Sequence, residues 1–218
     1  MGGDDRYLLI SAANSTSGNK LFIKDLRSDT DELITLFADE RADGYLLESD
    51  GETLLISTNY KAPKGRVVAI DPQNPKETNW RDIIPESEVV LTARAGAGFI
   101  FAEYMIDALS QVKQFDLKGQ FVRDIELPDF GTASGFSGKK EQDTIYFSFT
   151  NYRIAPAIFE LDPKSGDTKL YRASKSPFDG NRYKTEQVFY TSKDGTRIPM
   201  IITWCAVCGT AKNTRTWS

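Results

Sequence analysis

The stretch RVVAIDPQNP, residues 66–75, decides the fold of this chain because its pattern recurs along the sequence. An apolar run ends in an aspartate, Asp71, and polar turn residues follow it. Three other stretches have the same order of apolar strand, aspartate and turn: LFIKDLRSD with Asp25, VKQFDLKGQ with Asp116 and AIFELDPKSGD with Asp162. Successive aspartates are 46, 45 and 46 residues apart. A period this regular indicates a protein built from structural repeats.

The remainder of the unit repeats as well. A denser apolar strand precedes each aspartate, as in TLLIS at 53–57, and another strand follows the turn. A short apolar stretch then opens the next unit: GYLLE at 44–48, EVVLT at 88–92 and SGFSG at 134–138. The turns carry glycine, which supplies positive φ: Asp50-Gly51, Gly96-Ala97-Gly98, Lys118-Gly119 and Ser165-Gly166. Four short strands in each unit of about 46 residues predict the blades of a β-propeller.

Two alternatives accompany this interpretation. One alternative is a β-sandwich whose strand spacing is regular by accident, but three successive intervals within one residue of each other argue against it. The repeated aspartates are assigned no catalytic role, because an aspartate before a turn mostly accepts hydrogen bonds from nearby backbone. We therefore expect an all-β fold with about four four-stranded blades over residues 1–175.

The repeat pattern breaks after the fourth unit. Residues 174–184, SKSPFDGNRYK, are polar and indicate a linker. The next stretch, EQVFYTSKDGTRIPMII at 186–202, alternates as a strand on both sides of Asp194-Gly195 and so predicts a β-hairpin. Pro199 cannot donate a backbone hydrogen bond, which makes the second arm an edge strand or a bulged strand.

Three of these stretches resemble the prolyl oligopeptidase (prolyl endopeptidase) family of serine peptidases. QVFYTSKDGTRIPM (187–200) resembles the segment where that family's chain leaves its propeller and enters its α/β-hydrolase domain. STNYKAPKGRVVAIDP (57–72) and GFSGKKEQDTIYFSFTNY (135–152) resemble its propeller. The resemblance covers about residues 4–203 and implies a two-part enzyme. A seven-bladed propeller covers the active site and admits short peptides, and a hydrolase domain with Ser, Asp and His cleaves after proline.

The resemblance also implies how the chain is divided. Residues 1–175 would be a partial propeller, the last four of seven blades. Residues 176–203 would be a linker and the first hairpin of a truncated peptidase domain. Residues 204–218 depart in composition from both parts, as a frameshift, an alternative exon or a mis-predicted gene end would. No residue of the family's triad can be carried over, because no stretch of this sequence matches the segments that hold it.

The sequence predicts no catalytic, cofactor-binding or metal-binding residue. The 218 residues include no histidine, which excludes the Ser-His-Asp and Cys-His arrangements and the commonest zinc sites. There is no G-x-S-x-G elbow, and the nearest cluster, GTASGFSG at 131–138, has the wrong spacing and is interpreted as a turn between blades. Cys205 and Cys208 form a CxxC, but zinc needs two further ligands and a redox pair needs a βαβ setting.

Other sequence features are weaker. Gly96-Ala97-Gly98 lacks the third glycine of a dinucleotide-binding loop and predicts a hairpin turn. Four aromatic residues either line a tunnel or pocket or belong to the blade cores: Trp80, Tyr60, Tyr104 and Tyr152. The net charge is −4 and the basic residues are scattered among acids, so we expect a solvated surface and no nucleic-acid partner. No apolar run reaches the roughly 20 residues that cross a bilayer, so we expect no membrane contact. The MGGDDRY start has no apolar signal region, but a targeting signal on a longer parent would not be visible here. The two cysteines do not indicate a disulfide-rich secreted protein, so we expect a cytoplasmic one.

Three hypotheses for function follow. In the first, the chain is a fragment of a prolyl oligopeptidase-like serine endopeptidase that hydrolyses short peptides on the carboxyl side of proline. The fragment would gate substrate access and be inactive alone, and its partners would be short proline-containing peptides. In the second, it is a non-catalytic propeller-type module that binds peptides or proteins. In the third, its parent prefers other substrates, as oligopeptidases specific for basic residues and acylaminoacyl peptidases do. Open blade edges predict aggregation or oligomers of the isolated chain.

Overall fold

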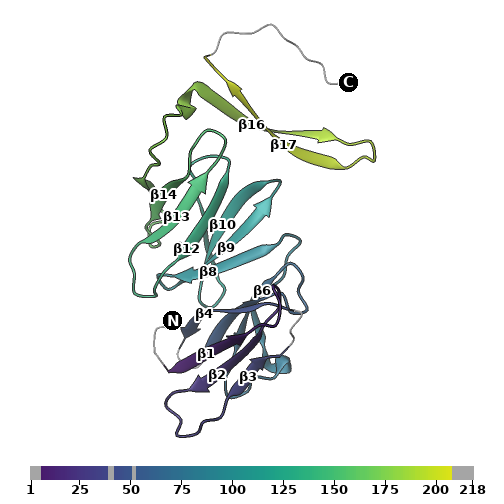
Figure 1. The fold of residues 1–218 in the computed structure, drawn as a ribbon, viewed down its shortest axis with the longest axis vertical. Coiled ribbons are helices and arrows are strands. Elements are labelled where there is room, and N and C mark those ends of the chain that lie inside the picture. The colour runs from purple at the N-terminus through teal and green to yellow at the C-terminus, as the bar shows by residue number, and fades with distance from the viewer. Residues whose placement is uncertain (1–5, 39–41, 51–52, 208–218) are drawn as a thin grey trace.

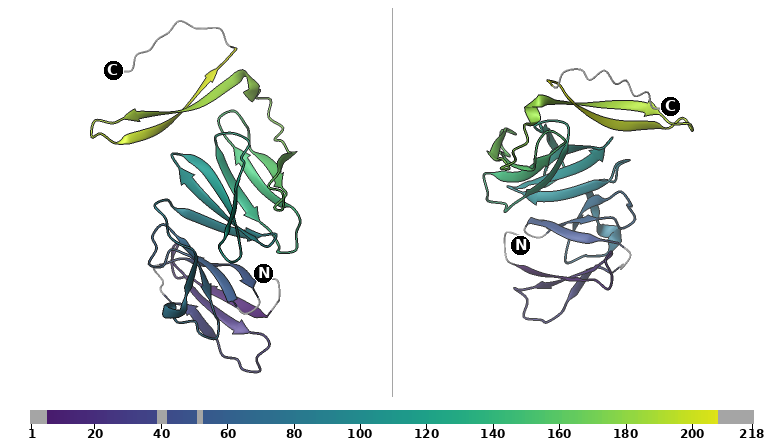
Figure 2. Two further views of the ribbon diagram at one scale, coloured as in Figure 1. Left: turned by 180° about the vertical axis from the view of Figure 1, so that it is seen from behind. Right: turned by 45° about the horizontal axis from the view of Figure 1, so that its top comes forward.

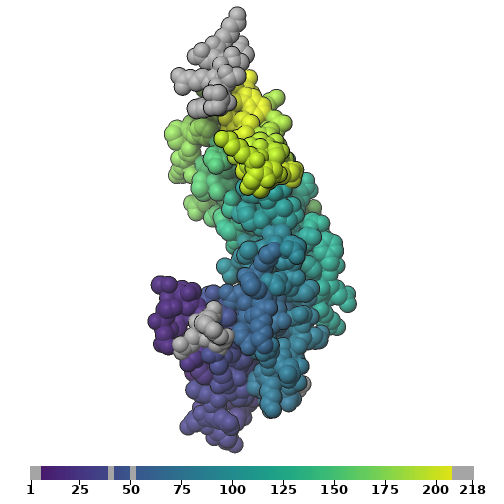
Figure 3. Space-filling model, turned by 90° about the vertical axis from the view of Figure 1, so that its right-hand side faces the viewer, coloured from purple at the N-terminus to yellow at the C-terminus, as the bar shows by residue number. Residues whose placement is uncertain are grey.

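The computed structural model describes residues 6–38, 42–50 and 53–207 and shows an all-β protein. Four antiparallel sheets follow one another in chain order, and a two-stranded hairpin lies beyond the fourth (Figure 1). Seen from the side, the molecule is elongated and curved, and the first sheet and the hairpin lie at opposite ends (Figure 3). The predicted all-β fold with blade-like sheets is confirmed.

Each sheet is a simple meander in which consecutive strands pair. The first sheet has three strands, β1 (Tyr7–Ala12), β2 (Lys20–Asp25) and β3 (Ile34–Phe37). The second has β4 (Gly44–Asp50), β5 (Thr53–Thr58), β6 (Arg66–Ile70) and β7 (Arg81–Ile84). The third has β8 (Leu91–Gly96), β9 (Phe99–Ile106), β10 (Leu109–Asp116) and β11 (Phe121–Ile125), and the fourth has β12 (Thr132–Ser137), β13 (Ile145–Thr150), β14 (Ala157–Leu161) and β15 (Thr168–Arg172).

Two strands differ from their predicted positions. The first strand of the third sheet was expected at 88–92 but begins only at Leu91, because the chain first passes over the surface and the Leu91 amide bonds to the Lys64 carbonyl. The stretch at 134–138, which was expected to open the fourth unit, lies almost entirely in strand β12, so the interpretation of the wider cluster at 131–138 as a turn is wrong. A β-bulge near Gly135, which has φ +123°, lets this glycine- and serine-rich stretch pair along β13.

Three hydrophobic cores lie between consecutive sheets. The second strand of an internal sheet contributes to two cores at once: Leu54 and Ile56 of β5 face the first sheet, while Leu55 faces the third. The third sheet repeats this arrangement, with Ile100 facing the second sheet and Phe101 the fourth. Strands buried on both faces need continuous apolar runs, which explains the dense apolar stretches in the sequence.

The first and last sheets are covered on one face only. In β13, Ile145, Phe147 and Phe149 are buried against the third sheet. Tyr146, which follows Ile145, points outward. Tyr146 contacts Tyr171 on this outward face, with ring centroids 4.9 Å apart. At the other end, Leu8 of β1 is exposed while Leu9 packs into the core. The exposed surfaces at the two ends of the stack are therefore sheet faces that carry apolar side chains.

The four repeated aspartates have the same local role. Each accepts, through Oδ1, the backbone N–H of the residue two positions later, at 2.7–3.0 Å: Asp25 from Arg27, Asp71 from Gln73, Asp116 from Lys118 and Asp162 from Lys164. These bonds close the turn before the last strand of each of the four sheets. The Asn74 side chain and then the Gln73 backbone N–H hold the pKa of Asp71 below its usual range, and the Lys164 and Ser165 backbone N–H groups do the same for the pKa of Asp162. The local structural interpretation of the aspartates agrees with this geometry.

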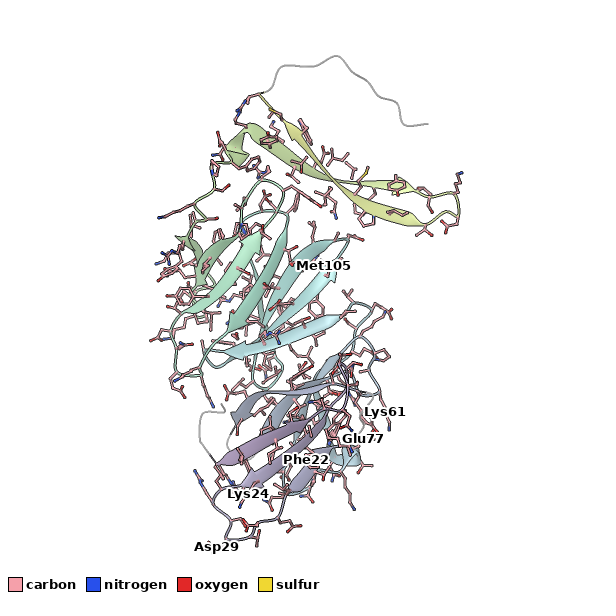
Figure 4. All side chains as sticks on the ribbon, in the orientation of Figure 1. Phe22, Lys24, Asp29, Lys61, Glu77 and Met105 are labelled. Atoms are coloured by element: carbon pink, nitrogen blue, oxygen red, sulfur yellow. The ribbon has the colours of Figure 1, made fainter. Side chains whose placement is uncertain are left out.

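A short 3₁₀ helix, Glu77–Asn79, lies between β6 and β7 and anchors the loop between β5 and β6 through side-chain contacts. Lys61 Nζ lies 2.7 Å from Glu77 Oε1, and the two side chains lie side by side at the rim of the second sheet (Figure 4). The Tyr60 hydroxyl donates to the other carboxylate oxygen of Glu77 at 3.1 Å. The TNYKAP stretch at 58–63 is thus tied to the turn before β7.

A second 3₁₀ helix, Gly180–Arg182, leads into the hairpin of β16 (Tyr183–Thr191) and β17 (Arg197–Cys205) (Figures 1 and 2). Gly195 has φ +85° at the turn, as the Asp-Gly signal predicts. The hairpin contacts the end of the third sheet near Met105, where the Gln187 side chain donates to the Asp107 carbonyl at 2.8 Å (Figure 4). In the described part of the chain, neither short helix has the length and apolar character needed to cross a bilayer.

Candidate functional site: the inner-strand wall

The first strands of the second, third and fourth sheets lie next to one another. Strand β8 contacts β4 on one side and β12 on the other, although each belongs to a different sheet. We call the exposed side chains described for these strands the inner-strand wall: Tyr45, Thr92, Arg94, Thr132, Ser134 and Ser137. Five of these six are uncharged and carry a hydroxyl group, so Arg94 is the charged member among them.

Two adjoining recesses open between β4 and β8. The larger has a volume of about 400 Å³ and is lined by Tyr45, Ser57, Leu91, Thr92, Ala93 and Arg94. The smaller, about 200 Å³, shares Tyr45, Ser57 and Leu91 with the first and adds Asp43, Thr58, Asn59, Pro63, Lys64, Gly65 and Val90. Small-molecule sites usually occupy concave surfaces of this size with a few convergent polar groups.

Asp43 lines the smaller recess, and its side chain and backbone make structural hydrogen bonds. Its Oδ1 accepts the Gly18 N–H at 2.9 Å, and its backbone N–H donates to Asn59 Oδ1 at 2.7 Å. The Tyr45 hydroxyl donates to the same Oδ1 at 3.4 Å. Burial raises the pKa of Tyr45, the Asp43 carboxylate raises it further, and the Arg94 charge lowers it.

Behind the wall, Glu103 of β9 is a partly buried carboxylate. It pairs with Thr92 of β8, and Arg94 pairs with Phe101, so Arg94 and Glu103 are diagonal neighbours on one face. Burial raises the pKa of Glu103 to about 7, while the Arg94 charge and a hydrogen bond from the Gly135 backbone lower it. Within the described residues, Glu103 Oε1 is buried and has no hydrogen-bond partner. The Arg94 charge thus acts on both the Tyr45 phenol and the Glu103 carboxylate, and no hydrogen bond or ion pair given for the described residues joins it to either.

The four aromatic residues considered in the sequence do not meet at one site. Trp80 and Tyr60 pack against Phe37 in the first core, and the Trp80 indole N–H donates to the Pro75 carbonyl at 2.9 Å. Tyr104 packs against the second core. Tyr152 lies outside the cores and is 70% exposed. The first three belong to the cores, which was one of the two interpretations.

Other sequence features are placed without forming a reactive site. Ala97-Gly98 forms the tight turn between β8 and β9, with φ of 53° and 77°, as the hairpin-turn interpretation predicts. Cys205 ends β17, two residues into the segment set apart from the hairpin, and Cys208 lies outside the described residues. Over the described ranges, no group of three or more His, Cys, Asp and Glu side chains is arranged to hold a metal ion.

Sequence reasoning missed Arg94 and Glu103, because it treated the basic residues as a solvated surface. One signal was available: Glu103 is a lone carboxylate in GFIFAEY, a strand whose other residues are almost all apolar. Its neighbour Arg94 is found only once the register of β8 against β9 is known. The wall offers a cation, hydroxyl groups and shallow recesses, which suit binding rather than bond cleavage.

Comparison with known proteins agrees with this architecture. The family model described as the prolyl oligopeptidase N-terminal β-propeller domain matches residues 1–174. A prolyl endopeptidase of Elizabethkingia miricola is 47% identical over 199 residues, which cover 91% of this chain and 28% of that protein. A solved structure from a mechanistic study of two prolyl endopeptidases is 29% identical, with a TM-score of 0.80 and coverage of 94% of this chain and 30% of the other.

A further solved structure shares the fold. Prolyl oligopeptidase B from Galerina marginata, bound to a 25mer macrocyclization substrate, is 24% identical with a TM-score of 0.77, covering 94% of this chain and 30% of that one. The chain thus spans less than a third of the length of these relatives. Because the family model matches most of the chain and the Elizabethkingia protein is nearly half identical, the chain belongs to the prolyl oligopeptidase family.

Proposed function

We propose that this chain is the propeller part of a prolyl oligopeptidase-like serine endopeptidase, which hydrolyses short peptides on the carboxyl side of proline. The observation that carries the proposal is the 47% identity to a prolyl endopeptidase over 91% of the chain. In this proposal, residues 1–175 are four blades of a seven-bladed propeller and residues 176–203 are a linker and the first hairpin of the peptidase domain. Residues 204–218 are proposed to be a departing tail, although β17 extends into it as far as Cys205. The proposed compartment is the cytoplasm.

The role proposed for this part is to gate access of substrates. The chain contains no histidine and no G-x-S-x-G sequence, so these 218 residues supply no activated serine. What they supply is a wall of adjoining inner strands with a single cation and several hydroxyl groups. Short proline-containing peptides are the proposed partners. The peptide-bound Galerina marginata relative supports a peptide as the ligand class.

A chimera tests this proposal. The matched segment of the Elizabethkingia miricola enzyme is replaced by the corresponding residues of this chain, and the unaltered enzyme is the control. We expect the chimera to cleave a short Gly-Pro substrate after proline and to cleave a long unfolded protein far more slowly. A folded chimera that no longer cleaves after proline would contradict the proposal. Equal cleavage of short and long substrates would contradict the gating role alone.

A second candidate, a non-catalytic module that binds peptides or proteins, is favoured by one observation. The outward faces of the terminal sheets expose apolar side chains, including Leu8 at one end and Tyr146 and Ile158 at the other. Such faces are suited to a partner sheet or protein. If the isolated chain is a monomer that binds a protein partner through these faces, and the chimera is inactive, this second candidate replaces the first.

A further inference from the structure

The larger recess between β4 and β8 has the donors expected of an anion site. Arg94 lies at its edge and is exposed. Among the hydrogen bonds and ion pairs that the structure gives for described residues, none uses the Arg94 guanidinium, whereas Lys64 of the neighbouring recess is bonded to Glu88 at 3.0 Å. A guanidinium has five donors in a planar fork that matches the two oxygens of a carboxylate.

Hydroxyl groups complete the donor set of this recess. Ser57 and Thr92 each contribute one hydroxyl donor to its lining, whereas the Tyr45 hydroxyl donates to Asp43 and is left as an acceptor. A hydroxyl can donate to one oxygen of an anion, and it can also accept a backbone N–H of the same ligand. The recess therefore offers donors for a carboxylate and acceptors for the peptide group that precedes it.

The adjoining smaller recess can take a side chain. Pro63, Val90 and Leu91 give it an apolar part, and Val90 is 60% exposed. The recesses share Tyr45, Ser57 and Leu91, so a ligand held in one extends directly into the other. Asp43, the acid that lines the smaller recess, accepts hydrogen bonds from the Gly18 amide and the Tyr45 hydroxyl at its Oδ1.

We propose that the inner-strand wall binds the C-terminal carboxylate of a short peptide, with Arg94 as its anchor and the last side chain of the peptide between Val90 and Leu91. The choice of a peptide as the ligand rests on the proposed function, but the site itself rests on the recess and on Arg94. Glu103 acts as a positioning residue when it is ionised, because the register places it diagonally to Arg94 and its negative charge attracts the guanidinium. A peptide held this way points its amino end away from the wall.

Ligand-observed NMR on the full 218-residue chain tests the site. The probes are acetyl-Gly-Pro-Ala with a free carboxylate, the same peptide as its C-terminal amide, and inorganic phosphate. We expect the acid to bind about tenfold more tightly than the amide, as a charge-assisted bidentate bond provides. Arg94→Gln should lower the affinity for the acid to that for the amide. Arg81→Gln removes an equal charge at the exposed start of β7 and should leave the affinity for the acid unchanged.

Several results would overturn the inference. Equal affinity for acid and amide, or full affinity in Arg94→Gln, would remove the anchor. If phosphate displaces the peptide acid with an affinity equal to that of the acid itself, the site binds anions in general and is not specific for peptide termini. Circular dichroism of each variant confirms that it is folded. If the chimera is active but the 218-residue chain shows no preference for the acid over the amide, only this site is rejected. If the chain prefers the acid but the chimera is inactive, only the proposed function is rejected.

Discussion

Burial changes the acid–base chemistry of Glu103, which lies between the third and fourth sheets. Its pKa is raised from 4.5 to about 7, chiefly because burial disfavours the charged carboxylate. The groups that oppose this are Arg94 on β8 and the Gly135 backbone on β12. The β12 segment carries no titratable side chain, and the residue paired with Glu103 on β10 is Val112. Glu103 is thus the site where pH acts on the packing of two blades.

The first prediction concerns the pH dependence of stability. Between pH 4.5 and about 7, the folded chain keeps a proton on Glu103 that the unfolded chain has released. Folding therefore takes up a proton, and the free energy of unfolding decreases as the pH rises through this window. Glu103→Gln should remove this decrease and stabilise the chain at pH 8 by about 1–2 kcal/mol, a value reduced for the partial exposure of the group.

Urea unfolding of both proteins at pH 5 and pH 8 measures this difference. The control is Glu126→Gln, which neutralises an exposed acid just after β11 and should leave the pH dependence as it is. If Glu103→Gln and the unmodified chain lose the same stability between the two pH values, the carboxylate is ionised normally and the account of its burial is wrong.

At the scale of the element, the turn between β10 and β11 shows how closely neighbouring blades approach. Gly119 and Gly195 both have φ +85°, so a side chain is strained at either position. A Cβ on Gly119 would lie 2.2 Å from the Ile83 carbonyl oxygen of β7, whereas a Cβ on Gly195 meets nothing within 4 Å. The two glycines therefore separate backbone strain from contact between blades.

This pair gives a second prediction. Gly195→Ala should cost only the strain of the left-handed backbone, about 1 kcal/mol. Gly119→Ala should cost about 1–3 kcal/mol more, because the turn must also move away from β7. Thermal unfolding of both variants measures the difference. Equal losses would mean that the third sheet does not approach the second as closely as described.

The sequence predicted elements well where a local bond defines them. Asp71 and its three equivalents close their turns by accepting hydrogen bonds from the backbone two residues later. Their spacing in the sequence therefore predicted the repeat of the blades. Asp194-Gly195 predicted the hairpin for the same reason. The start of β8 at Leu91 was missed because it depends on a bond to Lys64 in another sheet. The inner-strand wall was missed because only the packing of three sheets brings its residues together.

At the scale of the whole molecule, the outward faces of the terminal sheets are exposed. Ile158 is 39% exposed on the last sheet, beside the Tyr146–Tyr171 pair. We predict that the isolated chain associates, because an uncovered apolar sheet face gains free energy by burial. Light scattering across a concentration series should show a rising mass, and Ile158→Lys should reduce it. Tyr152→Lys, in the loop after β13, is the control, and a monomer at all concentrations would contradict the prediction.

The central proposal is that these residues are the propeller part of a proline-directed peptidase and supply none of its bond-cleaving groups. The most direct measurement is to incubate the purified chain with short proline-containing peptides and analyse the products by mass spectrometry. The account predicts no cleavage above that of buffer alone, because the chain has neither histidine nor a serine elbow. Cleavage on the carboxyl side of proline that purifies with the chain and is abolished by a serine-directed inhibitor would contradict it.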